Sequence, residues 1–433
     1  MKLHLISLGC VKNLVDSEVM LGKLQNYKIT PNLEEADLII VNTCGFIESA
    51  KTESVETILE AIENKKENSI LVVAGCLSER YKQDLQKELP EVDIFTGVGD
   101  YGRIDELISK KQSQFSDEVY LIHNEDRVIT NSNYHSYIKL SEGCNQKCSF
   151  CAIPSFKGRL NSREIPEIIQ EIKKLKEKGF TDFSLASQDS SSYLRDKGVR
   201  DGLEQLIKEI DKIDNINVRI LYLYPSTTTK KLIKTILNSK NIQNYFDMPI
   251  QHISDKMLKI MKRGSSVKKL KELLELMKSK NSFVRTSVII GHPSETDEDF
   301  KELKEFIKEY KFDRVNVFAY SDEEGTTAYL RKDKIDEKII NKRISKIQTI
   351  IDKTTKQNLK KYLDKKIECF MDGLTDDGLF YSVRPKLWTP EVDGDILINE
   401  SEIEELKIGK VYTVIPNQLV GEELVGKIIN ENK

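Results

Sequence analysis

Residues 142–151 read EGCNQKCSFC and place Cys144, Cys148 and Cys151 at C-x3-C-x2-C spacing. Three thiolates so close together in the chain predict a metal centre, but a structural zinc site or an ordinary electron-transfer cluster takes four protein ligands. Three cysteines therefore leave one coordination position open, and an open metal position is a reaction centre. A zinc knuckle that borrows a distant fourth ligand remains the alternative.

A second group of three cysteines becomes visible once strands are assigned. Cys10, Cys44 and Cys76 end the apolar runs LHLISLGC, DLIIVNTC and SILVVAGC, which predict buried parallel strands. The amphipathic segments between these runs are long enough for crossover helices, which gives a β-α-β-α-β unit. Because the carboxyl ends of parallel strands meet at one edge of a sheet, we expect the three thiols to converge there. Three ordinary buried cysteines are the alternative.

From about residue 137 to residue 321, predicted strands and helices alternate strictly. The strand candidates begin with SYIKLSEG and end with DRVNVFAYS, and the helix IPEIIQEIKKLKEKG has its isoleucines at helical spacing before Gly179. Six such β/α units predict an open (β/α)6 partial TIM barrel. The loop from Cys144 to Cys151 follows the first of these strands, at the end of a barrel where chemistry takes place. A long charged helix is expected over about 335–364.

The tail, from about residue 365 to residue 433, consists of short β-rich runs separated by turn residues, which predicts a small antiparallel β-barrel. From residue 364 onward it contains 15 acidic and 8 basic residues, a charge of −7, so the first 363 residues carry +4 of the total of −3. Nucleic-acid binding would need the opposite sign, and an acidic barrel favours a basic protein partner. An ordinary solvated acidic surface is the alternative. Cys369 is expected in the core, whereas Trp388 could be an exposed contact or the main core residue of the tail.

Length and composition indicate a soluble globular protein of two to three domains, since 32 % of the 433 residues are charged and 39 % are hydrophobic. We expect three domains, over residues 1–125, 130–363 and 364–433. The chain shows no signal sequence and no apolar stretch of about 18 residues, so we expect a cytoplasmic protein that does not bind membranes. In that reducing compartment, six of seven cysteines in two groups of three indicate metal ligation rather than disulfides.

The cluster loop, with the aromatic Phe150 before its last cysteine, resembles the signature of the radical S-adenosylmethionine (SAM) superfamily. With three N-terminal cysteines on strand ends and a terminal barrel of the TRAM type, the whole chain is similar to the methylthiotransferases. The resemblance implies a methylthiotransferase domain, a radical SAM core and a TRAM-like barrel, in that order. It also implies SAM and two 4Fe-4S clusters as cofactors, each cluster having one open iron. The ligands would be Cys10, Cys44 and Cys76 for the auxiliary cluster and Cys144, Cys148 and Cys151 for the core cluster.

Two branches of this family differ in substrate. The stretches NTCGFIESA, GCLSERY, LYLYPS, FDMPIQHISD and FAYSDEEGTTA resemble the branch that methylthiolates the β-carbon of an aspartate in the twelfth protein of the small ribosomal subunit. The transfer-RNA branch, which modifies an adenosine, would carry RGCN at the cluster and a Thr-His-Pro turn at Tyr222 to Pro225. One departure from the resemblance is Ser294, which stands in GHPSET where a glycine is usual. A transfer-RNA methylthiotransferase and a non-enzymatic zinc scaffold remain the other hypotheses.

The resemblance further implies radical chemistry without a catalytic side chain. An electron from the core cluster would cleave SAM to a 5′-deoxyadenosyl radical, which takes hydrogen from the aspartate, and a second SAM would methylate a sulfur held on the auxiliary cluster. The expected partners are the ribosomal protein, an electron donor such as flavodoxin or ferredoxin, and a sulfur source.

Candidate ligand contacts lie at the predicted strand ends, the default binding site of a barrel. The candidates for cofactor binding are Phe150, Ser187, Gln188, Asp189, Arg219, Ile290 and Gly291. The candidates for substrate contacts are Arg159, Arg163 and His252. A guanidinium matches a carboxylate bidentately, so either arginine could hold the SAM carboxylate or the substrate aspartate. A purely structural role is an equal alternative for each polar candidate.

Overall fold

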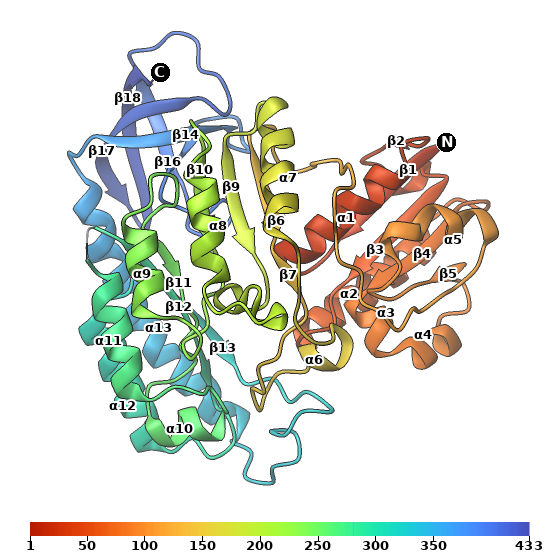
Figure 1. The fold of residues 1–433 in the computed structure, drawn as a ribbon, viewed down its shortest axis with the longest axis horizontal. Coiled ribbons are helices and arrows are strands. Elements are labelled where there is room, and N and C mark those ends of the chain that lie inside the picture. Colours follow the sequence, from red (N-terminus) through yellow and green to blue (C-terminus); the bar gives the residue numbers. More distant parts are fainter. Residues whose placement is uncertain (280, 433) are drawn as a thin grey trace.

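The computed structural model describes residues 1–279 and 281–432; Lys280 and Lys433, which fall in the predicted central and C-terminal domains, lie outside the described residues. An α/β sheet unit, an open barrel and a small closed barrel follow one another along the chain (Figure 1). The predicted fold class is therefore confirmed.

The N-terminal unit is a five-stranded parallel sheet in the order β2-β1-β3-β4-β5. Its middle strands are the three apolar runs that end near cysteines, and β3 is buried along its whole length because it packs on both faces. The short strands β2 and β5 were not predicted, since two residues carry no periodicity. The elements are β1 (Lys2–Ser7), α1 (Val11–Lys23), β2 (Lys28–Ile29), β3 (Leu38–Thr43), α2 (Glu48–Asn64), β4 (Ile70–Gly75), α3 (Cys76–Arg80), α4 (Lys82–Glu88), β5 (Ile94–Phe95) and α5 (Ile104–Lys110).

The central unit contains two three-stranded parallel sheets, β10-β9-β6 and β11-β12-β13, which an isolated bridge between Val218 and Ile242 connects. No pairing among the described residues joins β6 to β13, so the barrel stays open on that side. Its elements are β6 (His135–Lys139), β7 (Ser141–Glu142), α6 (Ile153–Phe156), β8 (Asn161–Ser162), α7 (Ile165–Glu177), β9 (Asp182–Ala186), α8 (Gly202–Ile210), β10 (Asn217–Ile220), α9 (Lys230–Leu237), β11 (Tyr245–Asp247), α10 (Asp255–Ile260), α11 (Val267–Met277), β12 (Phe283–Ile290), α12 (Asp297–Tyr310), β13 (Arg314–Ala319) and α13 (Glu337–Leu359).

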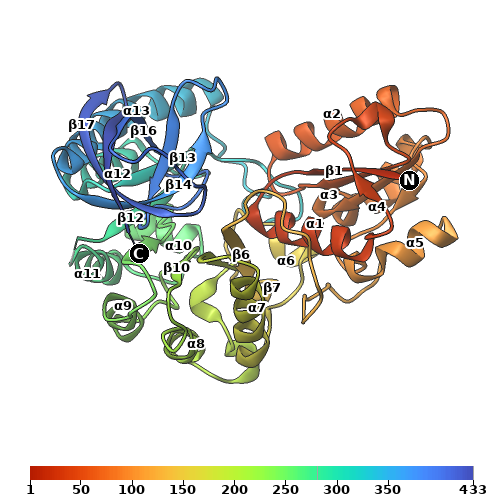
Figure 2. The ribbon, with the colours of Figure 1, turned by 90° about the horizontal axis from the view of Figure 1, so that it is seen from above.

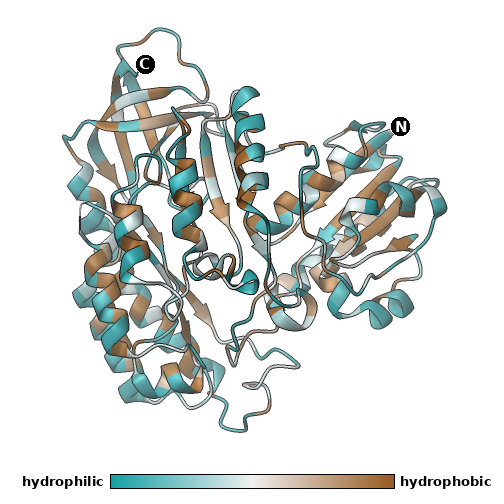
Figure 3. Ribbon diagram, in the orientation of Figure 1, coloured by the Kyte–Doolittle hydropathy of each residue, from teal (hydrophilic) through white to brown (hydrophobic). Residues whose placement is uncertain are grey.

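The helices of the central unit form an arc outside its strands, and the N-terminal unit stands beside the open edge (Figure 2). Strand residues alternate between the two faces. Phe183 and Leu185 of β9 pack in the large apolar core shared with the helices, whereas Asp182 and Ser184 face the interior of the barrel. The same division appears as apolar strands surrounded by helices that are polar on their outer sides (Figure 3).

The C-terminal unit is a closed barrel with the strand order β14-β15-β16-β18-β17. Four neighbouring pairs are antiparallel, as predicted, but β16 and β18 run parallel. An odd number of strands cannot alternate in direction around a closed ring, so at least one parallel pair is unavoidable. The strands are β14 (Ile367–Leu374), β15 (Tyr381–Pro385), β16 (Ile396–Ser401), β17 (Val411–Val420) and β18 (Glu423–Glu431).

The small barrel closes the amino-terminal end of the open barrel. Trp388 is only 1 % exposed and its ring contacts the rings of Phe283 on β12 and Tyr362. Arg384 of β15 donates a hydrogen bond to Asp182 at the start of β9, at 2.8 Å. Trp388 is therefore a core residue of this contact. Cys369 is fully buried, as expected.

The helices of the described ranges, 1–279 and 281–432, include none with the length and apolar character needed to cross a membrane.

Candidate functional site

The three N-terminal cysteines leave neighbouring strands at the same edge of the sheet. Cys10 is the N-cap residue of α1, Cys44 follows β3, and Cys76 opens α3 directly after β4. The register aligns Ser7 with Asn42 and Thr43 with Gly75, so β1, β3 and β4 end side by side. This is the arrangement that the spacing predicted.

A glycine is required for the close approach of the first two of these cysteines. Gly9 has a φ of +85°, which favours glycine, and a Cβ there would lie 2.6 Å from the Cβ of Cys44. The segment before Cys10 can therefore pass directly against Cys44 only because residue 9 has no side chain.

The three N-terminal thiols differ in acidity. Burial acts to raise the pKa of Cys10, but the Lys12 cation and the backbone N–H groups of Asn13 and Lys12 lower it overall. Cys10 is accessible to solvent although protein atoms surround its thiol, while Cys44 and Cys76 are buried. Burial raises the pKa of Cys44 and raises that of Cys76 to about 12. Metal binding must therefore displace the protons of Cys44 and Cys76 against the effect of burial.

The other three cysteines lie in the loop between β7 and α6, at the carboxyl end of the open barrel. Backbone hydrogen bonds fix this loop: Cys144 N–H donates to Gly158 O at 3.1 Å, and Ser149 N–H donates to Met261 O at 3.1 Å. All three side chains are half-buried. Burial raises the pKa of Cys144 to about 11 and that of Cys151 to about 12.

Each group of thiols suits an iron–sulfur cubane. Within residues 1–279 and 281–432, no three His, Cys, Asp or Glu side chains are grouped so that they could hold a single metal ion. A cubane bonds each cysteine to a different iron, and three thiols in each group supply one sulfur to each of three irons. Cysteine thiolates are also the usual ligands of such clusters. The donor set of each group therefore fits this cofactor.

The polar candidates after β9 hold the cluster loop in place. Asp189 accepts hydrogen bonds from Gln146 between the first two loop cysteines, at 2.8 Å, and from Ser191, Ser192 and Thr227. Gln188 donates to Glu142, and its own Oε1 is buried without a partner in the described residues. The structure brings Gln188 and Asp189 to the site, where their side-chain hydrogen bonds are to other residues of the protein.

Ser187, Phe150 and the end of β12 also lie at this end of the barrel. Ser187 is buried with its hydroxyl 3.2 Å from that of Ser190. Phe150 packs against a small apolar group that contains Met257, Met261 and Ile289. Ile290 is buried, and a Cβ on Gly291 would lie 2.4 Å from Ile340 of α13, so glycine is needed there for packing. Cofactor contacts of these residues stay predictions.

The guanidinium of Arg219 lies at the opposite end of the barrel from the cysteines. It donates to Asp182 at 2.8 Å and to the carbonyls of Lys386 and Leu387 in the small barrel. The sequence analysis named it because it lies on the third predicted strand of the barrel, without showing which end of the barrel its side chain faces. One hydrogen bond stays within the central unit and two reach the C-terminal unit, so all three guanidinium nitrogens are engaged with the protein.

The substrate candidates fall into three different environments. Arg163 is buried and donates to Lys139 O, Glu171 and His123 O, so it is engaged with the protein. His252 is buried against Glu295, and burial lowers its pKa to about 4. Arg159 is exposed and makes no side-chain hydrogen bond or ion pair within the described residues. The Nε2 of His252 and the Nε of Arg163 also have no hydrogen-bond partner among the described residues, but both atoms are buried. Of the three, Arg159 alone is exposed with its whole guanidinium unpaired in the described ranges.

A buried charge network missed by the sequence reasoning joins the two groups of cysteines. Asp16 of α1 contacts Lys139 of β6, and Lys139 contacts Glu142 at 2.7 Å. Lys157, just after the cluster loop, lies 3.5 Å from both carboxylates. Glu142 is two residues before Cys144, and Asp16 is on the helix that Cys10 caps. The two contacts of Asp16, with Lys139 and Lys157, link residues more than 100 positions apart, so no local pattern in the sequence predicts them.

A second connection runs through the segment after β13. Glu323, 1 % exposed, accepts from Arg80 at 2.6 Å and lies 3.2 Å from Lys51, both in the N-terminal unit. Ala328 N–H donates to Ser149 O between the loop cysteines, at 2.8 Å. The stretch FAYSDEEGTTA therefore contacts both cysteine-bearing regions.

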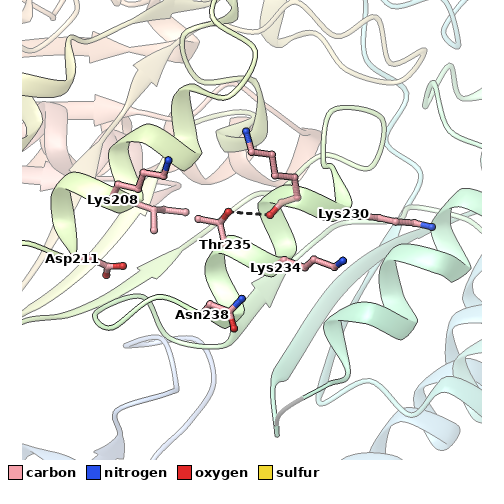
Figure 4. A pocket seen from close by; sticks show the side chains of 8 residues that line it. Lys208, Asp211, Lys230, Lys234, Thr235 and Asn238 are labelled. Carbon is pink, nitrogen blue, oxygen red and sulfur yellow. Dashed lines mark hydrogen bonds between the residues drawn. The ribbon is translucent and has the colours of Figure 1, made fainter.

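A separate pocket of about 500 Å³ lies between α8 and α9, on the outer side of the barrel (Figure 4). Lysines dominate its lining, and none of the six cysteines contributes to it. The residues labelled in the figure are Lys208, Asp211, Lys230, Lys234, Thr235 and Asn238. It is not part of the site described above.

Comparisons with known proteins identify the family. Residues 2–97 match the model of the uncharacterized protein family UPF0004, and residues 138–307 match that of the radical SAM superfamily. The chain is 59 % identical over 430 residues to the ribosomal protein uS12 methylthiotransferase RimO of Nitratiruptor sp., covering 99 % of both chains. It is 56 % identical to the RimO of Aliarcobacter butzleri, covering 99 % of this chain and 97 % of that one.

This chain belongs to the RimO family. It is a radical SAM methylthiotransferase, as the cysteine spacing and the quoted stretches predicted. Membership of the radical SAM superfamily means that a RimO-type enzyme uses SAM together with an iron–sulfur centre. The hypothesis of a non-enzymatic zinc scaffold is therefore wrong.

Solved structures show the same fold at low sequence identity. The radical SAM methyltransferase TsrM from Kitasatospora setae, with cobalamin and a [4Fe-4S] cluster bound, superimposes with a TM-score of 0.54 at 13 % identity, over 73 % of this chain and 72 % of that one. A second TsrM structure, with tryptophan and a SAM analogue, gives 0.55 at 14 % identity over the same shares.

Proposed function

We propose that this enzyme methylthiolates the β-carbon of an aspartate in ribosomal protein uS12, with one 4Fe-4S cluster on Cys10, Cys44 and Cys76 and another on Cys144, Cys148 and Cys151. The placement of both cysteine groups at the carboxyl ends of parallel strands, joined by one buried charge network, carries this proposal. The full-length similarity to uS12 methylthiotransferases supports the substrate.

When bound, the clusters and SAM supply one-electron cleavage of SAM, hydrogen abstraction, and the sulfur and methyl group that carbon receives. The protein's own residues bind, orient and shield these groups. The charge network of Asp16, Lys139, Glu142 and Lys157 fixes the distance between the two cysteine groups. Because its members are almost fully buried, breaking one contact leaves an uncompensated charge, which makes the arrangement rigid.

Lys12 stands between the N-terminal cysteines and the interior of the open barrel. Its ammonium group lies 4.4 Å from the centre of the Tyr222 ring at the end of β10. Burial opposes its charge, yet the neighbouring Cys10, Tyr222 and Glu142 raise its pKa, so it stays protonated at neutral pH. We infer that Lys12 attracts anionic groups, including the target carboxylate, to the space between the two cysteine groups. Arg159 would offer a second, exposed cation for the SAM carboxylate or the substrate.

The acidic tail suits a basic protein partner. At the free edge of β13, a pocket of about 410 Å³ is lined by Arg314 and by four carboxylates. These carboxylates are Asp352, Glu391, Asp395 and Glu422. Their charge favours a Lys- and Arg-rich segment over nucleic acid, whose phosphates they would repel. We also propose that the enzyme works in the cytoplasm, where the ribosome is. Its electron donor would be a flavodoxin or ferredoxin, and a separate molecule would supply the sulfur. The proposed domain limits are 1–125, 130–363 and 364–433.

Mass spectrometry of uS12 tests the proposed function. In cells that carry the gene, the aspartate-containing peptide should gain the mass of a methylthio group, and in cells without the gene this mass should disappear. Complementation with the wild-type gene restores it, whereas complementation with Cys148→Ala does not. An unmodified uS12 in wild-type cells would overturn the substrate, and a methylthiolated transfer RNA in its place would identify the other branch of the family.

A further inference from the structure

Arg263 occupies a backbone position that the end of α10 fixes. Lys262 follows the helix in the left-handed conformation, with a φ of +55°. Its N–H donates to Lys259 O at 3.1 Å, and Arg263 N–H donates to Leu258 O at 2.9 Å. These two bonds form a Schellman motif, which ends the helix at a defined angle. The Arg263 side chain therefore starts from a rigid support.

The Arg263 side chain reaches the sulfur of Cys148, which lies 115 positions earlier in the chain. Its Nη1 donates to Cys148 Sγ at 3.2 Å and its Nη2 donates to Pro249 O at 2.6 Å. The guanidinium stacks on the Tyr224 ring, 4.1 Å from the ring centre. The Tyr224 hydroxyl is itself 3.3 Å from the same sulfur. Two side chains thus hydrogen-bond to one sulfur, and both would donate to it once Cys148 is a thiolate.

The charge of Arg263 has no carboxylate to balance it within the described residues. Arg263 is 4 % exposed, and the other arginines buried to a similar degree all form ion pairs with Asp or Glu. Those arginines are Arg127, Arg163, Arg219, Arg343 and Arg384. A buried cation needs an anion nearby, because an unpaired buried charge is strongly destabilising. The thiolate that Cys148 becomes when it binds metal is the only anion that its hydrogen bonds reach.

The geometry points to Arg263 and Tyr224 as positioning residues that hydrogen-bond to the Cys148 thiolate and raise the reduction potential of the cluster held by Cys144, Cys148 and Cys151. This inference rests on the proposed core cluster. Reduction adds a negative charge to a cluster, and hydrogen bonds to its sulfurs, together with a nearby cation, stabilise that charge. Both residues would therefore ease reduction of the cluster by its electron donor, the step that must precede electron transfer to SAM.

The potential of the isolated core cluster tests this inference. The parent protein carries Cys10→Ala, Cys44→Ala and Cys76→Ala, so that after anaerobic reconstitution only the core cluster contributes. An EPR-monitored redox titration without SAM measures its midpoint potential. Arg263→Met should make reduction about tenfold less favourable, a fall of about 59 mV for one electron. Arg263→Lys, which keeps the charge but not the planar fork, should fall in between. Tyr224→Phe should cost about threefold, the size of one neutral hydrogen bond.

Arg343→Met is the matched control. Arg343 is also buried in the central unit, but it pairs with Glu295 and Asp297 and not with a cysteine. Its loss should leave the potential of the core cluster unchanged. If Arg263→Met binds no iron, the inference is tested by the midpoint potential of Tyr224→Phe, which removes only one oxygen atom. Unchanged potentials in Tyr224→Phe and in whichever Arg263 variants bind iron would overturn the inference. A parent protein that binds no iron would instead overturn the proposed cluster site itself.

Discussion

The two ends of the open barrel differ in how completely their charged side chains are paired within the protein. At the amino-terminal end, Asp182 lies 2.8 Å from both Arg219 and Arg384, and Trp388 seals the opening, so the charges are paired within the protein. At the carboxyl-terminal end, the charges of Asp16, Lys139 and Glu142 are also paired. Arg263, however, reaches a thiol, and Arg159 has no side-chain partner among residues 1–279 and 281–432. The closed end therefore contributes stability, while the other end keeps unpaired groups for ligands.

Removing the metal-binding cysteines should have the largest effect on activity, and it should leave the stability of the metal-free protein unchanged. We expect Cys144→Ala, Cys148→Ala and Cys151→Ala together to abolish both SAM cleavage and methylthiolation of uS12. The corresponding triple variant of Cys10, Cys44 and Cys76 should retain SAM cleavage and lose methylthiolation. Each triple variant should lower the iron content from about eight to about four atoms per chain. Iron analysis and detection of 5′-deoxyadenosine measure these outcomes.

Urea unfolding of the same metal-free variants provides the contrast. Trp388 is the only tryptophan and reports the closed end, so its fluorescence midpoint should match that of the metal-free wild type. A triple variant of the N-terminal cysteines that keeps all of its iron would show that those residues hold no cluster.

Truncating Trp388 should lower the stability of the protein and leave its iron content unchanged. Trp388→Ala removes a ring that is 1 % exposed and packed against Phe283 and Tyr362, so we expect a loss of about 3–5 kcal/mol in unfolding free energy. Thermal unfolding followed by circular dichroism measures it. Leu379→Ala, which truncates a residue that is 73 % exposed on the same small barrel, should change stability by less than about 0.5 kcal/mol. Iron content in both variants should equal that of the wild type; a loss of iron in Trp388→Ala would mean that the two ends are not independent.

Acid should weaken the closed end through His135. Burial lowers the pKa of His135 to about 3, and the groups facing it are Asp182, Ser184, Tyr137, Arg219 and Arg384. Between that value and about 6.5, the unfolded chain binds a proton that the folded chain does not, so stability falls as the pH falls. At pH 5 the loss relative to pH 7 is about 2 kcal/mol from this residue.

His135→Gln isolates that contribution. Its stability should vary less between pH 7 and pH 5 than that of the wild type, as followed by Trp388 fluorescence in urea. The pKa of Asp182 is lowered to about 2, despite the opposing effect of burial, because Arg219 and Arg384 flank it, so Asp182 loses its charge only in more acidic solution. An equal pH dependence in the variant and the wild type would assign the acid sensitivity to other groups, such as the buried His252.

The sequence could predict those features of the two barrel ends that have a local pattern in the chain. The strands before Cys10, Cys44 and Cys76 are continuous apolar runs, and the loop from Cys144 to Cys151 is compact, so strand ends and cysteine groups could be placed without coordinates. Strand alternation alone did not tell which end of the barrel a polar residue serves. Arg219 was consequently expected near the cofactor, whereas it pairs with Asp182.

The missed residues depend on contacts between distant segments. Arg263 meets Cys148 across 115 positions, and Asp16 meets Lys139 across 123. Such pairs depend on how the open barrel, the N-terminal sheet and the loops pack against one another. The spacing of residues along the chain does not reveal this packing. The parallel pair of β16 and β18 is similar, because it follows from closing a ring of five strands and not from any single strand.

The smallest effect is expected at Ser294, a turn residue at the open end. Ser294 has a φ of +75°, a conformation that glycine adopts without strain, and its hydroxyl exchanges hydrogen bonds with Arg331 and Asp333. Ser294→Gly should relieve about 1–2 kcal/mol of backbone strain. It also loses those exposed hydrogen bonds and makes the unfolded chain more flexible, each worth about 0.5–1 kcal/mol, so the net change in stability should stay within about 1 kcal/mol. Ser294→Ala keeps the strain and loses the bonds, so it should be less stable than Ser294→Gly in the same thermal unfolding measurement. The reverse order would mean that side-chain contacts, and not backbone strain, determine stability at this turn. The carboxyl-terminal end of the barrel would then be stabilised, like the amino-terminal end, by side-chain pairing.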